Sequence, residues 1–180
     1  MTQGGVVVDL EEYPDIMDID AIGSRSLSDM EGGMGVRKPF DSALFKANDG
    51  PAREAVLSWL ARERPTWIEN PDPYGIDLLL KWNGRVVLGL EVERRHNWKS
   101  GAIFPFATIH VPARKLKYAS LGFPTYFMVT NRPMTHGLVL PFAMIANMAS
   151  VEVRNKYVEQ GEVFVDVPVI YAEVVALCQD

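Results

Sequence analysis

The sequence predicts an α/β (α+β) fold in which a central mixed β-sheet is flanked by helices. Three observations support this prediction: a helical pattern precedes a β-hairpin pattern, a short basic helix follows the hairpin, and an apolar run typical of a buried strand comes next. Helices and strands in such an order pack as helices on the faces of one sheet. With 180 residues, 48% of them hydrophobic and 23% charged, the chain has the composition of a globular protein with one sizeable core.

The beginning of the chain differs from the rest in charge. Residues 1–32 hold eight acidic residues and one arginine, whereas residues 33–180 hold 15 acidic and 17 basic residues. Residues 1–40 are therefore expected to form an acidic, flexible N-terminal arm, and residues 41–180 a single domain. The arm could be an inert solvated tail, could repel DNA, could cover a basic groove or could bind another protein.

The first strong helical pattern runs from Pro51 to Glu63. Proline suits the first position of a helix, and Pro65 explains why the pattern stops. Apolar residues recur at helical spacing, and a weaker pattern of one or two turns covers residues 41–47. The apolar positions are Ala55, Val56, Trp59 and Leu60.

The next pattern, over residues 76–93, is that of a β-hairpin. Two apolar runs, 78–80 and 86–88, flank Asn83-Gly84, which tolerate the positive φ angles of a tight turn. Asp77, Glu91 and Glu93 lie at the open end of this hairpin.

The hairpin register decides whether these acids meet. A two-residue loop would put Asp77 on the opposite face from Glu91 and Glu93. A three-residue loop, 82–84, would pair Lys81 with Arg85 and Asp77 with Gly89, so that all three acids share one face. We expect this second register or an equivalent bulge near Gly89, and we expect Gly89 to leave room for a metal ion and its waters.

Acids at the end of an apolar hairpin indicate a bound cation, since removing a carboxylate from water costs several kcal/mol unless a cation or donors compensate it. A divalent metal site follows as the leading hypothesis. The alternative is that Asp77 caps a strand while the glutamates lie on a solvated face, paired with Arg94, Arg95 or Lys81.

Further elements are expected after the hairpin. A polar loop over 94–101 leads to a strand over 107–111, and Pro112 opens a basic helix that ends at Leu121-Gly122. The remaining predictions are strands over 125–130 and 138–140, a helix over 141–149, and a last strand over 163–167 after a turn at 160–161.

Several classes of protein are disfavoured. Cys178 is the one cysteine, which excludes an intramolecular disulfide and a cysteine-based zinc site. No apolar run approaches the ~20 residues that span a bilayer, and the acidic beginning does not resemble a signal peptide, so we expect a cytoplasmic protein without membrane contact. The chain has no Walker glycine loop, dinucleotide fingerprint or Gly-x-Ser-x-Gly elbow, which disfavours nucleotide hydrolases, dehydrogenases and esterases.

The order of these motifs resembles the PD-(D/E)XK nuclease superfamily, which has the restriction-endonuclease-like fold. The motif positions are Gly75-Ile76-Asp77 and Leu90-Glu91-Val92-Glu93. The resemblance implies a restriction-endonuclease-like core within residues 41–180 and a Mg²⁺-dependent nuclease that hydrolyses phosphodiester bonds in DNA. It also implies that Asp77 and Glu91 bind Mg²⁺, for which Mn²⁺ would substitute. Many nucleases of this fold act as homodimers.

The resemblance implies roles for a few further acids. Glu54 resembles the first-helix acid that completes the metal site in some members, although a solvent-facing position is an equal alternative, and Glu69 is a weaker candidate for that role. Glu93 stands where the motif usually has lysine. It could orient or deprotonate the attacking water or hold a second metal.

A cation must then compensate for the missing motif lysine. Lys99, Lys115 and Lys117 are the candidates, and the last two are favoured as catalytic residues because their helix should lie beside the sheet edge. Ordinary phosphate contact is the alternative role. If no lysine acts, the protein would be a catalytically inactive nucleic-acid-binding or assembly protein with the same fold.

Basic and aromatic residues on both sides of the acids predict contact with DNA, because cations bind phosphates and aromatic rings stack on bases. The alternative is that Trp98 packs in the core and the charges are solvated. His96 and His110 could orient water, or could simply end a loop and a strand. The predicted nucleic-acid-binding residues are Arg94, Arg95, Lys99, Arg114, Lys115, Lys117 and Trp98.

Overall fold

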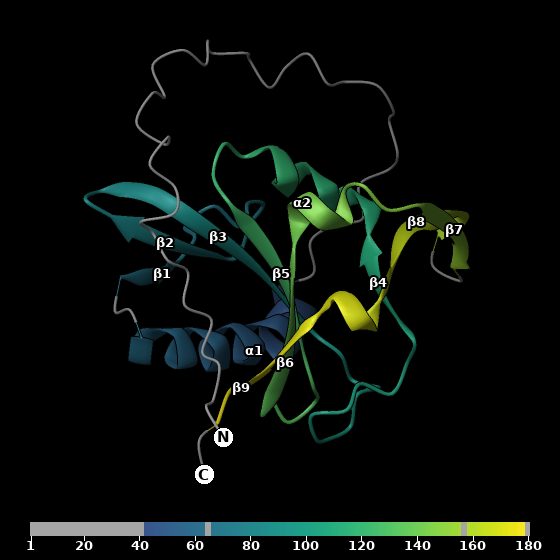
Figure 1. Ribbon diagram of the computed structural model, residues 1–180, viewed down its shortest axis with the longest axis horizontal. Coiled ribbons are helices and arrows are strands. Elements are labelled where there is room, and N and C mark those ends of the chain that lie inside the picture. The colour runs from purple at the N-terminus through teal and green to yellow at the C-terminus, as the bar shows by residue number, and fades with distance from the viewer. Residues whose placement is uncertain (1–41, 64–65, 156–157, 179–180) are drawn as a thin grey trace. The chain divides into compact units, whose positions relative to one another are not determined.

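The structure is a computed structural model that describes residues 42–63, 66–155 and 158–178 (Figure 1). The chain divides into two compact units, residues 1–40 and 41–180, and every described element belongs to the second. The predicted acidic arm lies outside the described residues. No helix in the described ranges is long and apolar enough to cross a membrane.

A six-stranded mixed sheet forms the centre of this unit, which confirms the predicted α+β class with a mixed sheet. Its strand order is β1-β2-β3-β5-β6-β9. β3 and β5 are parallel, and the other neighbouring strands are antiparallel. The strands are β1 (Trp67–Glu69), β2 (Leu78–Trp82), β3 (Arg85–Arg94), β5 (Thr125–Thr130), β6 (His136–Pro141) and β9 (Glu173–Ala176).

Helix α1 (Ser42–Glu63) packs on one face of the sheet, where Ala52 and Val56 are fully buried against Leu90 and Val92 of β3. The helix begins nine residues before the predicted Pro51. Pro51 therefore lies inside the helix. This is possible because a proline removes one backbone hydrogen bond and can kink a helix without ending it.

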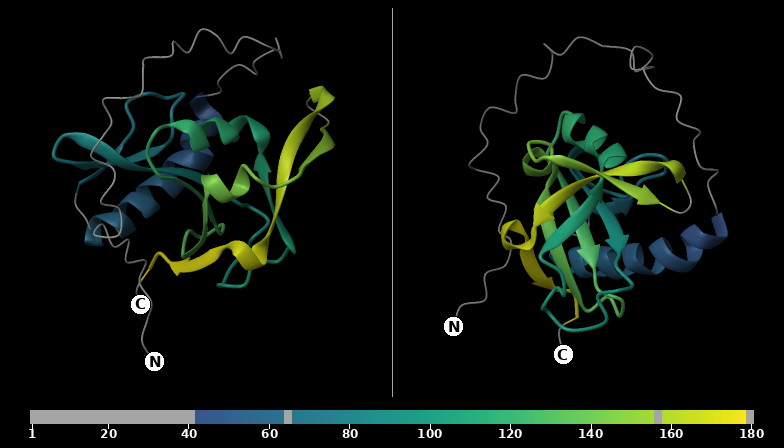
Figure 2. Two further views of the ribbon diagram at one scale, coloured as in Figure 1. Left: turned by 45° about the horizontal axis from the view of Figure 1, so that its top comes forward. Right: turned by 90° about the vertical axis from the view of Figure 1, so that its right-hand side faces the viewer.

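The other face is covered by the 3₁₀ helix η5 (Ala113–Ser120), the short helix α2 (Phe142–Ile145) and a second, three-stranded sheet in the order β4-β8-β7 (Figure 2). This sheet consists of β4 (Thr108–Pro112), β7 (Ser150–Asn155) and β8 (Val158–Pro168), and η6 (Val169–Tyr171) leads from it into β9. The unit therefore has three layers, with the central sheet in the middle.

Some predicted elements differ from the structure. The strand predicted at 107–111 pairs with β8 in the second sheet, and the helix predicted at 141–149 shrinks to α2. The turn predicted at 160–161 lies inside β8. β1, β7 and β9 were not predicted; β1 has only three residues, and β9 has an exposed Val174 that weakens the alternating pattern of a half-buried strand.

The β2–β3 hairpin has a two-residue loop, so the predicted three-residue loop is wrong. Trp82 pairs with Arg85, while Asn83 and Gly84 both have positive φ, as a two-residue hairpin turn requires. The expected bulge is nevertheless present. Lys81 pairs with Val86 and Leu80 with Leu88, which leaves Val87 as the extra residue.

This bulge shifts the register by one residue. Beyond it, Leu79 pairs with Gly89 and Leu78 with Leu90. Continuing the same register places Asp77 opposite Glu91, so the bulge brings the two acids to adjoining positions that the two-residue loop alone would have separated.

Candidate active site

Alternation along β3 sends its two glutamates toward η5. Leu90 and Val92 belong to the buried cluster under α1. Because side chains alternate along a strand, Glu91 and Glu93 point to the opposite face of the sheet. Glu91 is only 7% exposed. A carboxylate this deeply buried requires a partner.

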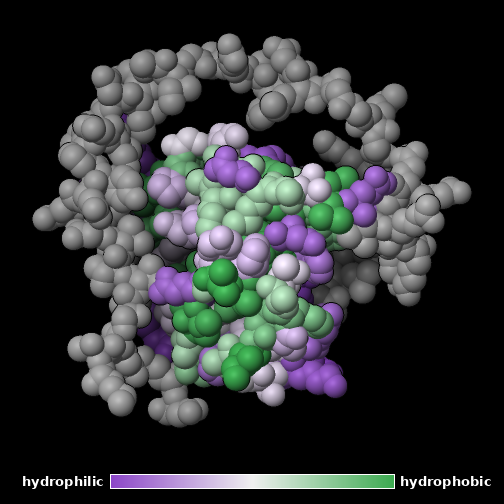
Figure 3. Space-filling model, turned by 45° about the vertical axis from the view of Figure 1, so that its right-hand side comes forward, coloured by the Kyte–Doolittle hydropathy of each residue, from purple (hydrophilic) through white to green (hydrophobic). Residues whose placement is uncertain are grey.

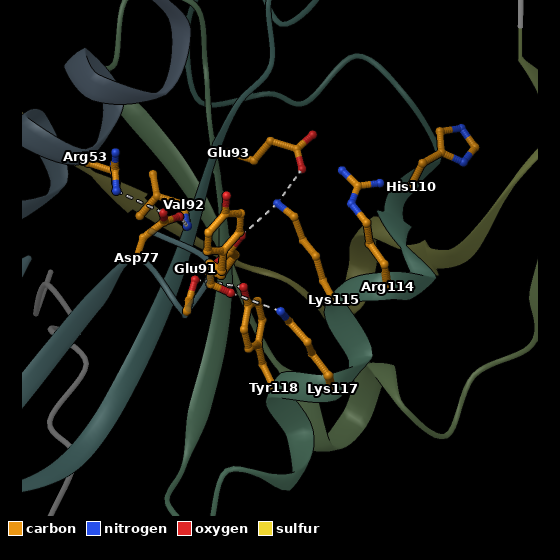
Figure 4. A network of polar contacts seen from close by, with 12 residues as sticks. Arg53, Asp77, Glu91, Val92, Glu93, His110, Arg114, Lys115, Lys117 and Tyr118 are labelled. Atoms are coloured by element: carbon orange, nitrogen blue, oxygen red, sulfur yellow. Dashed lines mark hydrogen bonds and ion pairs between the residues drawn. The ribbon is translucent and has the colours of Figure 1, made fainter. Parts of the chain in front are cut away.

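Lys115 of η5 is that partner. Its Nζ lies 3.0 Å from Glu91 Oε1 and 3.1 Å from Glu93 Oε2 (Figure 4). It also lies 5.1 Å from the centroid of the Phe127 ring. Burial alone would lower the pKa of Lys115, but Glu93 and Glu91 outweigh it and raise the pKa above its ordinary value. Lys115 is therefore a protonated cation between two carboxylates.

Glu93 is held by two cations. Its Oε1 lies 3.1 Å from Arg95 Nη2, and its Oε2 receives the Lys115 ammonium. Burial would raise the pKa of Glu93, but Lys115 and Arg95 outweigh it and lower the pKa. Glu93 is therefore ionised and fixed in position.

Asp77 directly precedes β2, near the plane of the sheet. Its Oδ2 accepts a hydrogen bond of 2.8 Å from the Val92 backbone N–H, and its Oδ1 accepts one of 3.2 Å from Arg53 Nη1. Because ladder N–H groups lie in the sheet plane, the Asp77 carboxylate stands between α1 on one side and Glu91 on the other.

Burial raises the pKa of Asp77 to about 7, and nearby Glu91 adds to this increase. The Val92 N–H, Arg53 and Lys115 oppose it. Asp77 and Glu91 are thus within electrostatic reach of each other, and near neutral pH the Asp77 carboxyl group exchanges between its protonated and ionised forms.

The segment before Asp77 is fixed from both sides. Asn70 N–H donates to the Asp77 carbonyl oxygen at 2.8 Å, and Asn70 Nδ2 donates to the Ile76 carbonyl at 2.8 Å. On the other side, the Tyr118 hydroxyl donates to the Gly75 carbonyl at 2.8 Å. These bonds position Asp77 although it lies outside the regular strand.

Two observations test whether the site fits a metal ion. Glu91 Oε2 is buried and has no hydrogen-bond partner within residues 42–63, 66–155 and 158–178, while Oε1 contacts Lys115. Among the described residues, no group of three or more His, Cys, Asp or Glu side chains is arranged to hold a metal. The second observation gives no support for a metal, and it is the unpaired Glu91 oxygen near the Asp77 carboxyl group that fits an ion such as Mg²⁺, which takes one or two carboxylates and completes its coordination with water and substrate oxygens.

The helix α1 contributes Arg53 to this site. Glu54, the acid predicted as a ligand, is exposed, whereas its neighbour Arg53 is buried and contacts Asp77. Arg53 was missed by the sequence analysis. Arg53 lies three residues before the buried Val56 and is therefore on the apolar side of the helix. This helical spacing was the signal in the sequence that could have indicated a buried Arg53.

Three other candidate residues lie apart from this network. Glu69 is exposed on β1, and His96 is exposed in the loop after β3. Lys117 donates to the Tyr74 carbonyl at 3.0 Å and lies 4.9 Å from the centroid of the Tyr118 ring. Of the two favoured lysines, the structure brings Lys115, and not Lys117, to the acids.

Gly89 does not provide space for a metal, contrary to our expectation. It pairs with Leu79, and a Cβ at this position would lie 2.9 Å from Ile76 Cδ1 and 3.1 Å from Phe123 Cε2. The missing side chain thus allows Ile76 and Phe123 to pack closely against β3.

The predicted DNA-binding residues have several different surroundings. Trp98 is 1% exposed and packs edge-to-face on Phe104, so its predicted role in stacking on bases is wrong. Arg94 donates to the Arg132 carbonyl, and Arg114 pairs with Glu162. Arg95 and Lys115 belong to the acidic network, and Lys99 and Lys117 are exposed.

Neither a scan against protein-family models nor a search of curated proteins finds a match to this chain. The chemistry of the site is therefore the basis for assigning a function.

Proposed function

We propose that the protein is a divalent-metal-dependent deoxyribonuclease with a restriction-endonuclease-like core. Mg²⁺ would be its metal, and Mn²⁺ would substitute. The observation that carries the proposal is the state of Glu91: one oxygen contacts a buried lysine, and the other is buried without a partner beside a second carboxyl group. Such an arrangement is costly in a protein that has no use for it.

The arrangement of elements supports the same proposal. α1 precedes the β1-β2-β3 meander, and the chain then passes through β4 and the basic η5 before β5 joins the sheet parallel to β3. This is the order of first helix, Asp strand, Glu-x-Glu strand, basic helix and apolar strand on which the resemblance to PD-(D/E)XK nucleases rests.

Each residue has a role in this proposal. Asp77 and Glu91 would hold the metal, which when bound supplies Lewis-acid stabilisation of the phosphate and lowers the pKa of a bound water. Lys115 places a positive charge beside the metal ligands and stabilises the negative charge that develops on the scissile phosphate. It thus supplies the cation that Glu93 cannot.

Glu93 and Arg53 would support these groups. Glu93, fixed by Lys115 and Arg95, can orient the attacking water, whereas its lowered pKa makes it a weak proton acceptor. Arg53 offsets the charge of Asp77 from the side of α1, which favours the ionised form that a metal requires.

The test is cleavage of plasmid, branched and single-stranded DNA in Mg²⁺ or Mn²⁺. The wild type is expected to cut at least one of these substrates, and Glu91→Gln is expected to abolish cutting. Glu173→Gln, a matched change at an exposed position on β9, should leave the rate unchanged. Cleavage that survives in Glu91→Gln would exclude Glu91 as a ligand.

A second function, DNA binding without turnover, is favoured by the balance of charge in the site. Each carboxylate already has a cationic neighbour: Arg53 for Asp77, Lys115 for Glu91, and Lys115 with Arg95 for Glu93. A nucleic-acid-binding or assembly protein could keep such a network as a structural element. It would bind DNA in a salt-dependent manner and cut nothing with either metal.

A further inference from the structure

A pocket of about 140 Å³ opens beside the acidic network, lined by Arg95, Asn97, Phe104, Phe106, Thr108 and His110. Arg95 belongs to both sites, because its Nη2 lies 3.1 Å from Glu93 Oε1. Arg95 therefore connects the pocket to the acidic network through Glu93. Cavities of about 150 Å³ accept a single benzene ring, so this pocket has room for one six-membered ring.

The lining combines aromatic rings with polar groups. Phe104 and Phe106 meet at 68° with their ring centroids 5.4 Å apart, and Phe106 is 45% exposed. Figure 3 shows that hydrophobic residues reach the surface between hydrophilic ones on one face of the molecule. An exposed aromatic side chain beside a cation and an amide is suited to a planar ligand with polar edges.

Two polar groups of the pocket, His110 and Arg95, are held in place. His110 Nδ1 contacts Asp166 Oδ1 of the neighbouring strand β8, which orients the ring and leaves Nε2 for another partner. In Figure 4 the ring of His110 points away from Lys115. Arg95 also donates to the His110 carbonyl oxygen. Such orientation is typical of a binding site and reduces the entropy that a ligand must remove.

We propose that this pocket binds one unpaired nucleobase of a DNA strand whose phosphate lies at Glu91 and Lys115. The ring of the base would stack on Phe106, and its polar edge would face Asn97, Thr108 and His110. The proposal rests on the proposed function in taking DNA as the ligand, and it adds the substrate class. A base inside a duplex is stacked and paired, so the pocket favours single strands, frayed ends or flipped bases.

The test is fluorescence anisotropy with the full chain in EDTA, so that binding is measured without cleavage. Three labelled probes of the same length are compared: a thymidine single strand of roughly 12 nucleotides, an abasic strand and a blunt duplex. The abasic strand carries the same phosphates but no bases. The wild type should bind the thymidine strand more tightly than the abasic strand, and equal affinities would overturn the proposal.

Variants then locate the binding to the pocket. Phe106→Ala should weaken binding of the thymidine strand by roughly five- to a hundredfold and leave the abasic strand and the duplex unchanged. Phe106→Trp should retain the affinity, which separates loss of stacking from loss of folding. Ile103→Ala, at a position that is 86% exposed and outside the pocket lining, is the matched control. Equal loss for all three probes, or no loss for any, would overturn the proposal.

The two proposals fail independently. Cleavage that needs Glu91, together with thymidine binding that is insensitive to Phe106, would exclude the base pocket and leave the nuclease. Phe106-dependent binding of the single strand without cleavage in either metal would exclude the nuclease and leave the pocket.

Discussion

Lys115 Nζ lies 3.0 Å from Glu91 Oε1, which joins a basic 3₁₀ helix to the central strand of the sheet. The Lys115 side chain is only 14% exposed, so its charge and that of Glu91 are largely removed from water. Each group needs the other, and both depend on η5 being docked on the face of the sheet opposite α1. Stability and chemistry are therefore linked at this ion pair.

Replacing Lys115 by methionine should destabilise the protein by about 3–5 kcal/mol, because it leaves the buried Glu91 carboxylate without its cation and Glu93 with Arg95 alone. Any cleavage activity should fall by about 10²-fold or more. Urea denaturation measures the first effect and a plasmid assay the second.

Two further variants make this prediction specific. Adding Glu93→Gln to Lys115→Met should restore part of the stability, because it removes the negative charge that then lies beside the unpaired Glu91, and a double-mutant cycle measures this coupling. Lys117→Met, on the same helix but exposed, should change stability by no more than about 0.5 kcal/mol. If both lysine variants have equally small effects, Lys115 does not hold the network together.

The stability of the metal-free protein should depend on the protonation of Asp77. Its pKa rises from 3.8 to about 7 on folding, so the native state binds the proton more tightly than the unfolded chain. The resulting stabilisation is fully present below pH 4 and is lost as the pH rises toward 7 and above. The difference between the two pKa values corresponds to a stabilisation of at most about 4 kcal/mol.

Asp77→Asn should remove this part of the pH dependence. The measurement is the free energy of unfolding in urea with EDTA at several pH values between 4.5 and 8, for the wild type and for the variant. The difference between the two should change most between pH 5 and 7 and become constant above pH 8. A difference that does not vary with pH would show that Asp77 titrates in the native state as it does in the unfolded chain.

The sequence predicted the acidic cluster because its signals are local. The turn residues Asn83-Gly84, the apolar runs beside them and the acids at their ends lie within one hairpin. A bulge near Gly89 was expected only as an alternative to the longer loop, since a register shift of one residue is fixed by packing on both faces of the sheet and not by the turn; the structure has it at Val87. A shift was nevertheless required for the acids to meet, which is why one was expected.

The remaining differences arise from contacts between distant segments. Neighbouring helical positions differ by about 100° around the axis, so only the docking of α1 decides that Arg53 and not Glu54 faces Asp77. Trp98 belongs to a polar stretch of sequence, yet its side chain is buried and packs edge-to-face against Phe104. The helical spacing of Arg53 to Val56 indicates its side of the helix but not its partner, and the burial of Trp98 leaves no periodic pattern at all.

Metal binding should release a proton, because Mg²⁺ and a proton compete for the Asp77 carboxylate, whose pKa lies near 7. The affinity for Mg²⁺ should therefore increase between pH 6 and pH 8. Isothermal titration calorimetry in two buffers of different ionisation enthalpy measures the number of protons released, which should approach one at pH 6. Asp77→Asn should bind Mg²⁺ weakly and release no proton, whereas undiminished binding by this variant would place the ion elsewhere.

Gly89 should prove necessary for the position of Asp77, although the two residues are not paired. An alanine at position 89 would bring its Cβ to 2.9 Å from Ile76 Cδ1, and Ile76 is 2% exposed and directly precedes Asp77. Gly89→Ala should therefore cost about 1–3 kcal/mol by overpacking and should lower activity by displacing the carboxylate. Ile76→Val removes the clashing Cδ1, so the double variant should regain stability and activity relative to Gly89→Ala, while Ile76→Val alone loses about 0.5–1.5 kcal/mol. Denaturation and cleavage measured on all four proteins give the coupling, and strictly additive losses would show that Ile76 does not transmit the effect.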